Sequence, residues 1–202
     1  KNNSLITLKP FLDGSLNFDI ESINIAIFNK FTFEKLTIYR DILKKINTTN
    51  EINFKSKKLS HNIIDELNLR IDLAYGRLNY SKSFSISDNI FKCKGNINLL
   101  EEYPLLFFDC LINSNNKRGL LKKFGINIKK KENGLLNIYT NGNLNIVSRK
   151  INFQEISMNE NYKASNDDLK YFKDKFENMF LNDKFEEILN LKKIKKFVLE
   201  IS

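Results

Sequence analysis

The side chains that most often carry catalysis or bind metals are sparse in this sequence. His61 is the single histidine and lies in the polar segment 58–62. A zinc site built on several histidines, or a triad with histidine as its base, therefore has little to draw on. The glycine-rich phosphate-binding motifs and the nucleophile elbow do not occur in the sequence either. The residue types disfavour hydrolytic and metal-dependent chemistry.

Neighbouring carboxylates occur twice, as Asp65 with Glu66 and as Glu101 with Glu102. Each pair is adjacent in sequence and falls in an expected turn or strand end. Adjacent residues of a strand point to opposite faces, so neither pair brings two carboxyl groups together for acid–base catalysis. We therefore expect a protein that is not an enzyme and that needs no metal and no cofactor.

Cys93 and Cys110 are the two cysteines, too few for a disulfide scaffold. They lie in two runs, residues 90–99 and 105–113, that can pair as a hairpin. A turn near Glu101 would then bring the two thiols almost opposite each other. The residues favour two small buried thiols over a bridge, and both states stay open.

The elements that would position these residues are short runs of alternating apolar and polar side chains, from about residue 15 to residue 153. Residues 67–73 are the clearest, with four apolar side chains alternating with Asn68, Arg70 and Asp72. Such alternation predicts a strand with one buried face. Regular spacing without long helices between the runs favours an antiparallel sheet over a parallel α/β fold. Further runs are residues 15–20, 23–27, 33–39, 52–56, 76–80 and 84–87.

Residues 125–148 predict a three-stranded meander. Asn141 and Gly142 tolerate the positive φ of a type I′ turn and so predict a two-residue loop between strands 135–140 and 143–148. Alternation then gives the meander one apolar face and one polar face. Its apolar face comprises Ile126, Ile128, Leu136, Ile138, Leu144 and Ile146.

The pattern changes to a helical period after residue 157. Ser165 and the carboxylates that follow it form a helix start, and an apolar stripe of Leu169, Phe172, Phe176 and Phe180 follows. Further helical stretches are predicted over 183–189 and 192–201. We expect residues 1–157 to form the sheet and residues 158–202 a helical cap on it; the alternative is that these helices lie on a membrane surface.

Net charge is +9, from 33 Lys and Arg against 24 Asp and Glu, which favours anionic partners. The most basic stretch spans residues 117–131 around Phe124. Aromatic residues elsewhere fall mostly on the apolar side of the alternation, away from the lysines, which disfavours single-stranded nucleic-acid binding. The sequence holds no apolar run long enough to span a membrane. Because it begins at Lys1 without methionine, we expect a fragment, with any membrane anchor upstream.

The runs Gly142-Asn-Leu-Asn-Ile146 and Lys150-Ile-Asn-Phe153, followed by a phenylalanine-rich helical tail, resemble the C-terminal region of AsmA-like proteins. Earlier runs starting at Gly14, Ile71 and Gly95 fit the same rhythm of glycine followed by alternating apolar residues. The resemblance covers most of residues 15–153 and rests on this rhythm rather than on fixed residues. It implies an elongated, curved, groove-like antiparallel sheet of repeated short strands that ends in amphipathic helices.

The resemblance also implies a function. AsmA-like proteins are implicated in phospholipid transport from the inner to the outer membrane and in outer-membrane upkeep, and are anchored in the inner membrane by an upstream helix. We therefore expect a periplasmic segment that shields phospholipid acyl chains. The expected lipid-facing residues are Leu69, Ile71, Leu73, Ile126, Ile128, Leu136, Ile138, Leu144 and Ile146. The alternatives are a structural or adhesion-type β domain with a closed core and a basic nucleic-acid-binding module.

Overall fold

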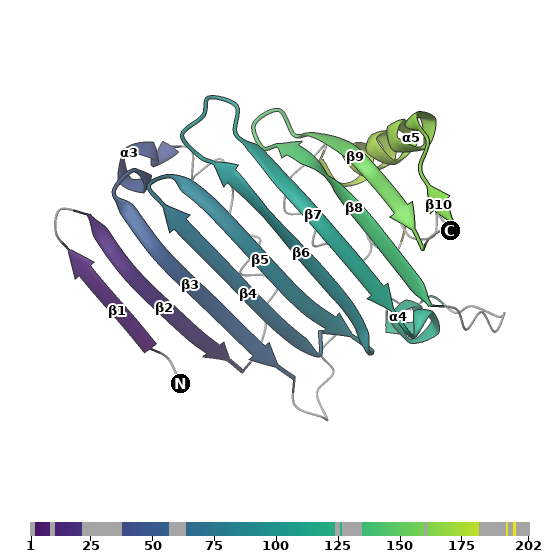
Figure 1. Cartoon of the computed structure of the whole chain (residues 1–202), viewed down its shortest axis with the longest axis horizontal. Helices are drawn as coiled ribbons and strands as arrows, with labels where there is room; N and C mark the ends of the chain where they lie inside the picture. The colour runs from purple at the N-terminus through teal and green to yellow at the C-terminus, as the bar shows by residue number, and fades with distance from the viewer. Residues whose placement is uncertain are drawn as a thin grey trace.

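A computed structural model of the 202-residue chain describes residues 3–8, 11–21, 38–56, 64–123, 126, 135–159, 161–181, 193 and 196. Within these residues one open sheet of ten strands dominates, as Figure 1 shows. The strands are β1 (Asn3–Leu8), β2 (Leu12–Ile20), β3 (Ile46–Lys55), β4 (Glu66–Ala74), β5 (Arg77–Ile86), β6 (Asn89–Asn98), β7 (Leu105–Ser114), β8 (Leu136–Asn145), β9 (Lys150–Met158) and β10 (Tyr162–Lys163).

The strands lie side by side in chain order from β1 to β10. Every neighbouring pair is antiparallel except β2 with β3, which is parallel. The prediction of a mainly β fold built on an elongated antiparallel sheet is confirmed. The parallel β2–β3 pair was not predicted. Hairpins connect most antiparallel neighbours, whereas 25 residues separate the end of β2 from the start of β3.

Within the described ranges, three helices and one π-helical turn accompany the sheet: α3 (Arg40–Leu43), α4 (Lys117–Lys123), α5 (Asn166–Phe176) and η1 (Glu177–Leu181). Helix α5 begins where the sequence predicts. The Ser165 side chain accepts a hydrogen bond from the Asp168 N–H, and the Asp168 carboxylate accepts one from the Ser165 N–H. The two bonds form a complete capping box. The bond from the Ser165 N–H, together with one from the Ser165 hydroxyl, lowers the pKa of the Asp168 carboxyl group.

Register determines the two faces of the sheet, because directly paired residues of neighbouring strands point to the same side. We call one side the apolar face. A row of apolar side chains crosses it from β4 to β8: Leu67, Phe84, Phe91, Ile112 and Ile138. The other side, the polar face, carries the parallel row Asn68, Ser83, Lys92, Leu111 and Tyr139. The alternation is therefore largely kept in phase from β4 to β8, although Leu111 and Tyr139 add apolar surface to the polar face.

Two clusters of buried residues lie on the apolar face, and Phe54 and Ile86 are buried outside them. In the first, Leu43 of α3 packs with Ile97, Leu99 and Ile146, next to the β4–β5 turn. In the second, Phe180 and Leu181 of η1 pack with Leu144 of β8 and Ile151 of β9. The C-terminal helical residues thus pack on the sheet through η1, whereas β10, inside the predicted cap of residues 158–202, is a strand of the sheet. The predicted helices at 183–189 and 192–201 lie outside the described residues, apart from Lys193 and Lys196.

A buried carboxylate fixes η1 to the sheet. Glu177 is 7% exposed and accepts hydrogen bonds from the Ile151 N–H at 3.0 Å and from Lys150 Nζ at 3.0 Å. The charge is therefore both paired and hydrogen-bonded, as a buried carboxylate must be. This contact positions the aromatic side chains of the second cluster over β8 and β9.

The predicted turn at Asn141 and Gly142 is wrong. Both residues lie inside the continuous strand β8, at a register shift in its pairing with β9. Gly142 is not among the described residues with positive φ. A Cβ at this position would instead clash with the carbonyl oxygen of Asn152 and lie 2.9 Å from Cζ of Phe108. Glycine is needed here for close approach of β9 and an aromatic ring, not for turn geometry.

The positive φ values occur at other hairpins. Tyr75 and Gly76 (φ 51° and 88°) join β4 to β5, and Ser87 and Asp88 (φ 49° and 65°) join β5 to β6. Two consecutive positive φ values are the pattern of a type I′ turn. Residues 76–80 and 84–87, predicted as separate strands, accordingly belong almost entirely to β5.

Other predictions are partly or wholly outside the described residues. Residues 23–27, most of 33–39, His61 and Ile128 are not described. Ile126 does not lie in a strand, and its N–H donates to the Leu121 carbonyl at 2.9 Å, just after α4. The first strand of the predicted meander is therefore wrong at Ile126. The hairpin of residues 90–99 and 105–113 is confirmed as β6 and β7.

The close approach at Gly142 can be tested by substitution. Gly142→Ala should lower the free energy of unfolding by about 1–3 kcal/mol, because the added methyl group forces β9 or Phe108 to move. Urea denaturation measures the change. Ser148→Ala is the control, since Ser148 is exposed in the turn between β8 and β9. Equal stability of both variants and the wild type would contradict the role given to Gly142.

The second cluster predicts a large effect at one aromatic residue. Phe180→Ala should cost about 3–5 kcal/mol of unfolding free energy, because the ring is 4% exposed and packs on β8 and β9. Tyr171→Ala on α5 is the control, since Tyr171 is 46% exposed. A similar small loss in both variants would show that η1 does not pack on the sheet in solution.

Candidate functional site

The apolar face carries most of the residues expected to contact lipid. Leu69, Ile71 and Leu73 of β4 share this face with Leu136, Ile138 and Leu144 of β8. Leu144 and Ile146 are buried in the two clusters, and Leu73 packs against the first. Leu69, Ile71, Leu136 and Ile138 are half-buried and belong to neither cluster. These four residues are the part of the expected set that the described helices do not bury.

The middle of this face contains a disulfide. Cys93 of β6 and Cys110 of β7 are direct cross-strand partners, with their Cα atoms 4.0 Å apart, and their sulfur atoms are bonded. The pairing of the two runs was predicted, but the residues favoured free thiols. A disulfide is typical of proteins in oxidising compartments. The alignment of the two runs was the signal for it, because it placed the thiols opposite each other.

Lys82 is the residue that sequence reasoning missed. It lies on the apolar face of β5, which also carries Leu78, Tyr80, Phe84 and Ile86. Its direct cross-strand partners are Leu69 on β4 and Cys93 on β6. The apolar surroundings lower the pKa of its ammonium group by desolvation. Its side chain nevertheless remains exposed. The alternation of apolar and polar residues along β5 was the signal that could have identified Lys82, because it assigns this lysine to the apolar side of the strand.

A tyrosine hydroxyl lies next to the same disulfide. Tyr80 Oη is 3.7 Å from Sγ of Cys93, which is the direct partner of Lys82. Burial raises the pKa of Tyr80 to about 12, with a further contribution from Asp109. The phenol therefore keeps its proton at neutral pH and can donate a hydrogen bond. Lys82 and Tyr80 are two residues apart on one face of a strand, which separates their Cα atoms by about 6.8 Å.

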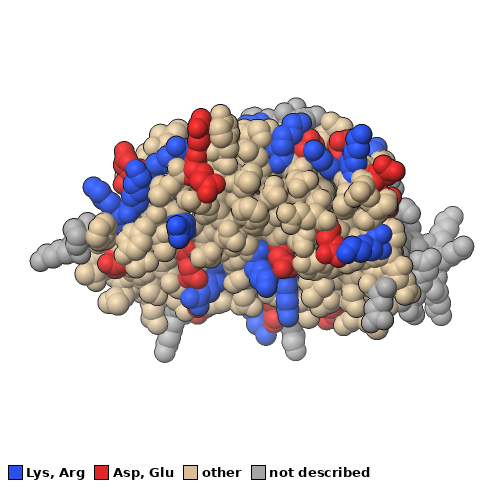
Figure 2. All heavy atoms as spheres, turned by 45° about the horizontal axis from the view of Figure 1, so that its top comes forward, with Lys and Arg blue, Asp and Glu red and all other residues tan. Residues whose placement is uncertain are grey.

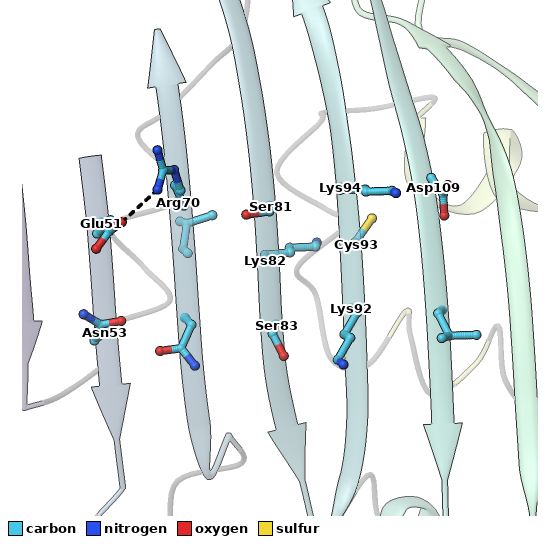
Figure 3. Close-up of a pocket in the computed structure, with 13 residues that line it drawn as sticks. Glu51, Asn53, Arg70, Ser81, Lys82, Ser83, Lys92, Cys93, Lys94 and Asp109 are labelled. Atoms are coloured by element: carbon cyan, nitrogen blue, oxygen red, sulfur yellow. Dashed lines mark hydrogen bonds and ion pairs between the residues drawn. The ribbon is translucent and has the colours of Figure 1, made fainter. Parts of the chain in front are cut away.

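The polar face contains a hollow of about 590 Å³ over β5, shown in Figure 3. Its centre is formed by β5, with the short side chains of Ser81 and Ser83. Lys82 also lines the hollow, although its pairing with Leu69 assigns its side chain to the apolar face. Longer side chains border the two serines: Arg70 on β4, and Lys92 and Lys94 on β6. By register Ser81 lies between Arg70 and Lys94, and Ser83 has Lys92 on one side. The hollow therefore arises because small residues of β5 lie between two strands of long side chains.

The charges in this hollow are mixed. Arg70 bonds to Asp72 at 3.0 Å and to Glu51 at 3.3 Å, and the bond to Asp72 is the main cause that raises its pKa. Among the described residues no hydrogen bond links Ser81 or Ser83 to Lys92 or Lys94, so a serine–lysine nucleophile is not assembled here. Glu51 and Asp109 lie at the two sides of the hollow and would repel an extended polyanion.

Charges elsewhere are also intermixed. In Figure 2 the Lys and Arg side chains alternate with Asp and Glu over the visible surface, without one large basic patch. Within the described part of the chain, no group of three or more His, Cys, Asp or Glu residues is arranged to hold a metal ion. None of the helices in this part is long and apolar enough to cross a membrane.

The chain matches no known family model, no curated protein and no solved structure.

The disulfide predicts a measurable contribution to stability. Replacing both cysteines by alanine should lower the unfolding free energy by about 3 kcal/mol, because the bridge closes a loop between residues 17 apart. Adding a reductant should destabilise the wild type to a similar extent and leave the double-alanine variant unchanged. Two titratable thiols in the non-reduced, denatured wild type would contradict the bridge.

Proposed function

We propose that this chain is a non-enzymatic, AsmA-like segment that shields phospholipid acyl chains on the apolar face of its sheet. In this role it would support phospholipid transport between the inner and outer membranes and so help to maintain the outer membrane. The observation that carries the proposal is the apolar face itself. From β2 to β9 most apolar side chains share this face, while the described helices contribute to two clusters, over the β4–β5 turn and over β8 and β9.

The middle of the apolar face has the size and chemistry to hold acyl chains. Half-buried side chains such as Leu69, Ile71 and Ile138 lie in rows that cross β4 to β8. Neighbouring strands are about 4.8 Å apart, so four strand spacings extend about 19 Å. Burying apolar surface contributes about 25 cal/mol per Å², so contact between one acyl chain and such a row would contribute a favourable binding free energy.

The disulfide supports the placement of this segment in the periplasm. Cross-strand bridges such as Cys93–Cys110 persist in oxidising compartments, which include the bacterial periplasm. The same bridge supports a structural or adhesion-type β domain equally well. The two alternatives differ in what covers the apolar face: bound lipid in the first case and protein alone in the second.

A pair of substitutions on one strand tests the proposal. Ile71 lies on the apolar face of β4, and Asn68 lies on the polar face and is exposed. Ile71→Asp places a carboxylate against acyl chains, which costs several kcal/mol when the charge cannot reach water. We expect Ile71→Asp to lose most co-purified lipid and Asn68→Asp, which introduces the same charge, to retain it. Mass spectrometry of lipids extracted from gently purified protein gives the measurement.

Folding must be verified independently in each variant. Circular dichroism and thermal unfolding identify a variant that has lost its structure, and Leu69→Asp provides a second apolar-face substitution if Ile71→Asp unfolds. Equal lipid content in folded Ile71→Asp and Asn68→Asp would contradict the proposal. A folded wild type without any lipid would favour the closed β domain, and salt-sensitive binding to polyanions would favour a nucleic-acid binder.

A further inference from the structure

A lysine in the middle of an apolar face needs an explanation. The four remaining apolar-face positions of β5 are occupied by Leu78, Tyr80, Phe84 and Ile86. Lys82 takes part in no ion pair or hydrogen bond within the described chain, and no charged group contributes to its pKa. Neighbouring apolar groups lower the pKa of its ammonium group by desolvation, although the side chain is exposed.

Two ordinary roles of such a lysine do not account for it. Inward-pointing lysines protect the edge strands of sheets from pairing with other chains, but β5 is the fifth of ten strands and has partners on both sides. A lysine can also cover apolar neighbours with its stem and extend its ammonium group into water. That role gives no reason for a second polar group beside it, and the Tyr80 hydroxyl lies next to Cys93, the direct partner of Lys82.

We propose that Lys82 binds the anionic headgroup of an amphiphile whose acyl chain lies on the apolar face, with the Tyr80 hydroxyl as a second hydrogen-bond donor. This inference rests on the proposed function and adds to it the chemistry of the ligand. The headgroup is a compact anion, a carboxylate or a phosphate, since both accept hydrogen bonds from ammonium and phenol groups. The Lys82 side chain is exposed, so a ligand can reach it.

The site has a simple geometry. Lys82 lies in the row Ile52, Leu69, Lys82, Cys93 and Cys110, which crosses the strands from β3 to β7. Apolar residues occupy both sides of this row along the strands: Leu67 and Ile71 on β4, and Tyr80 and Phe84 on β5. The acyl chain of a ligand whose headgroup is bound at Lys82 could therefore extend over apolar side chains in several directions. Charge and apolar contact together favour an amphiphile over a free anion or a neutral oil.

The test compares three ligands with the same twelve-carbon chain: dodecanoate, dodecyl phosphate and dodecanol. Binding to the full chain is measured by isothermal titration below the concentration at which each ligand forms micelles. We expect the wild type to bind one or both anionic ligands about tenfold more tightly than dodecanol, the preference expected for a charge-assisted hydrogen bond. A stronger preference for dodecyl phosphate indicates a phospholipid-type headgroup, and one for dodecanoate a fatty acid.

Substitutions assign this preference to one residue. Lys82→Met should reduce binding of the anionic ligands to the level of dodecanol, whereas Lys82→Arg should keep the preference. Lys92→Met is the matched control, because it removes the same charge from the polar face of the adjacent strand. Lys82→Met should also unfold at the same or a higher temperature, because it removes an unpaired charge from the apolar face.

The outcomes separate the two proposals. If all three ligands bind and Lys82→Met keeps the preference for anions, the role of Lys82 is wrong while the acyl-chain surface stands. If none of the ligands binds to the folded wild type, the proposed function fails and this inference fails with it. Loss of the preference in Lys92→Met as well as in Lys82→Met would show an effect of net charge rather than a site, and would also overturn the inference.

Discussion

The structure depends on the phase of the side-chain alternation between neighbouring strands. A strand places successive side chains on opposite faces, so a shift of one residue in any pairing would move a whole apolar set to the polar side. The pairings from β1 to β8 avoid such a shift, and the one-residue shift between β8 and β9 keeps Ile151 on the same face as Leu144 because the alternation within β9 changes at the same point. One continuous apolar face is the result, and it must be covered by helix, by another chain or by ligand.

The described helices cover this face unevenly. The first cluster gathers around Leu43 of α3, and the second around Phe180 and Leu181 of η1. Glu177 fixes the second cluster because its carboxylate accepts bonds from both the backbone and the side chain of β9. The two buried clusters thus form where α3 and η1 meet the sheet. The middle rows of β4 to β7 instead hold half-buried apolar residues, a disulfide and a lysine.

The two faces of β5 carry side chains of different size and polarity. Small serines on the polar face leave a hollow, while large apolar residues on the other face alternate with a single charge. The hollow is bordered by both signs of charge, and Arg70 is already paired with Asp72 and Glu51. Lys82 has no such partner in the described chain. That difference is the reason why the apolar face, rather than the hollow, carries the inference about a ligand.

The sequence by itself determined the fold class, most strand positions and the faces of the best strands. Alternation over residues 67–73 and the capping residues at Ser165 are local signals, and short-range geometry is enough to interpret them. The tertiary structure alone decided the role of Asn141 and Gly142. Asparagine and glycine fit a type I′ turn, but glycine also allows close approach, and which property is used depends on the Asn152 backbone and the Phe108 ring. Pairing between strands likewise decided that Cys93 and Cys110 are bonded and that Lys82 lies among apolar neighbours, because register joins residues that a linear pattern cannot place together.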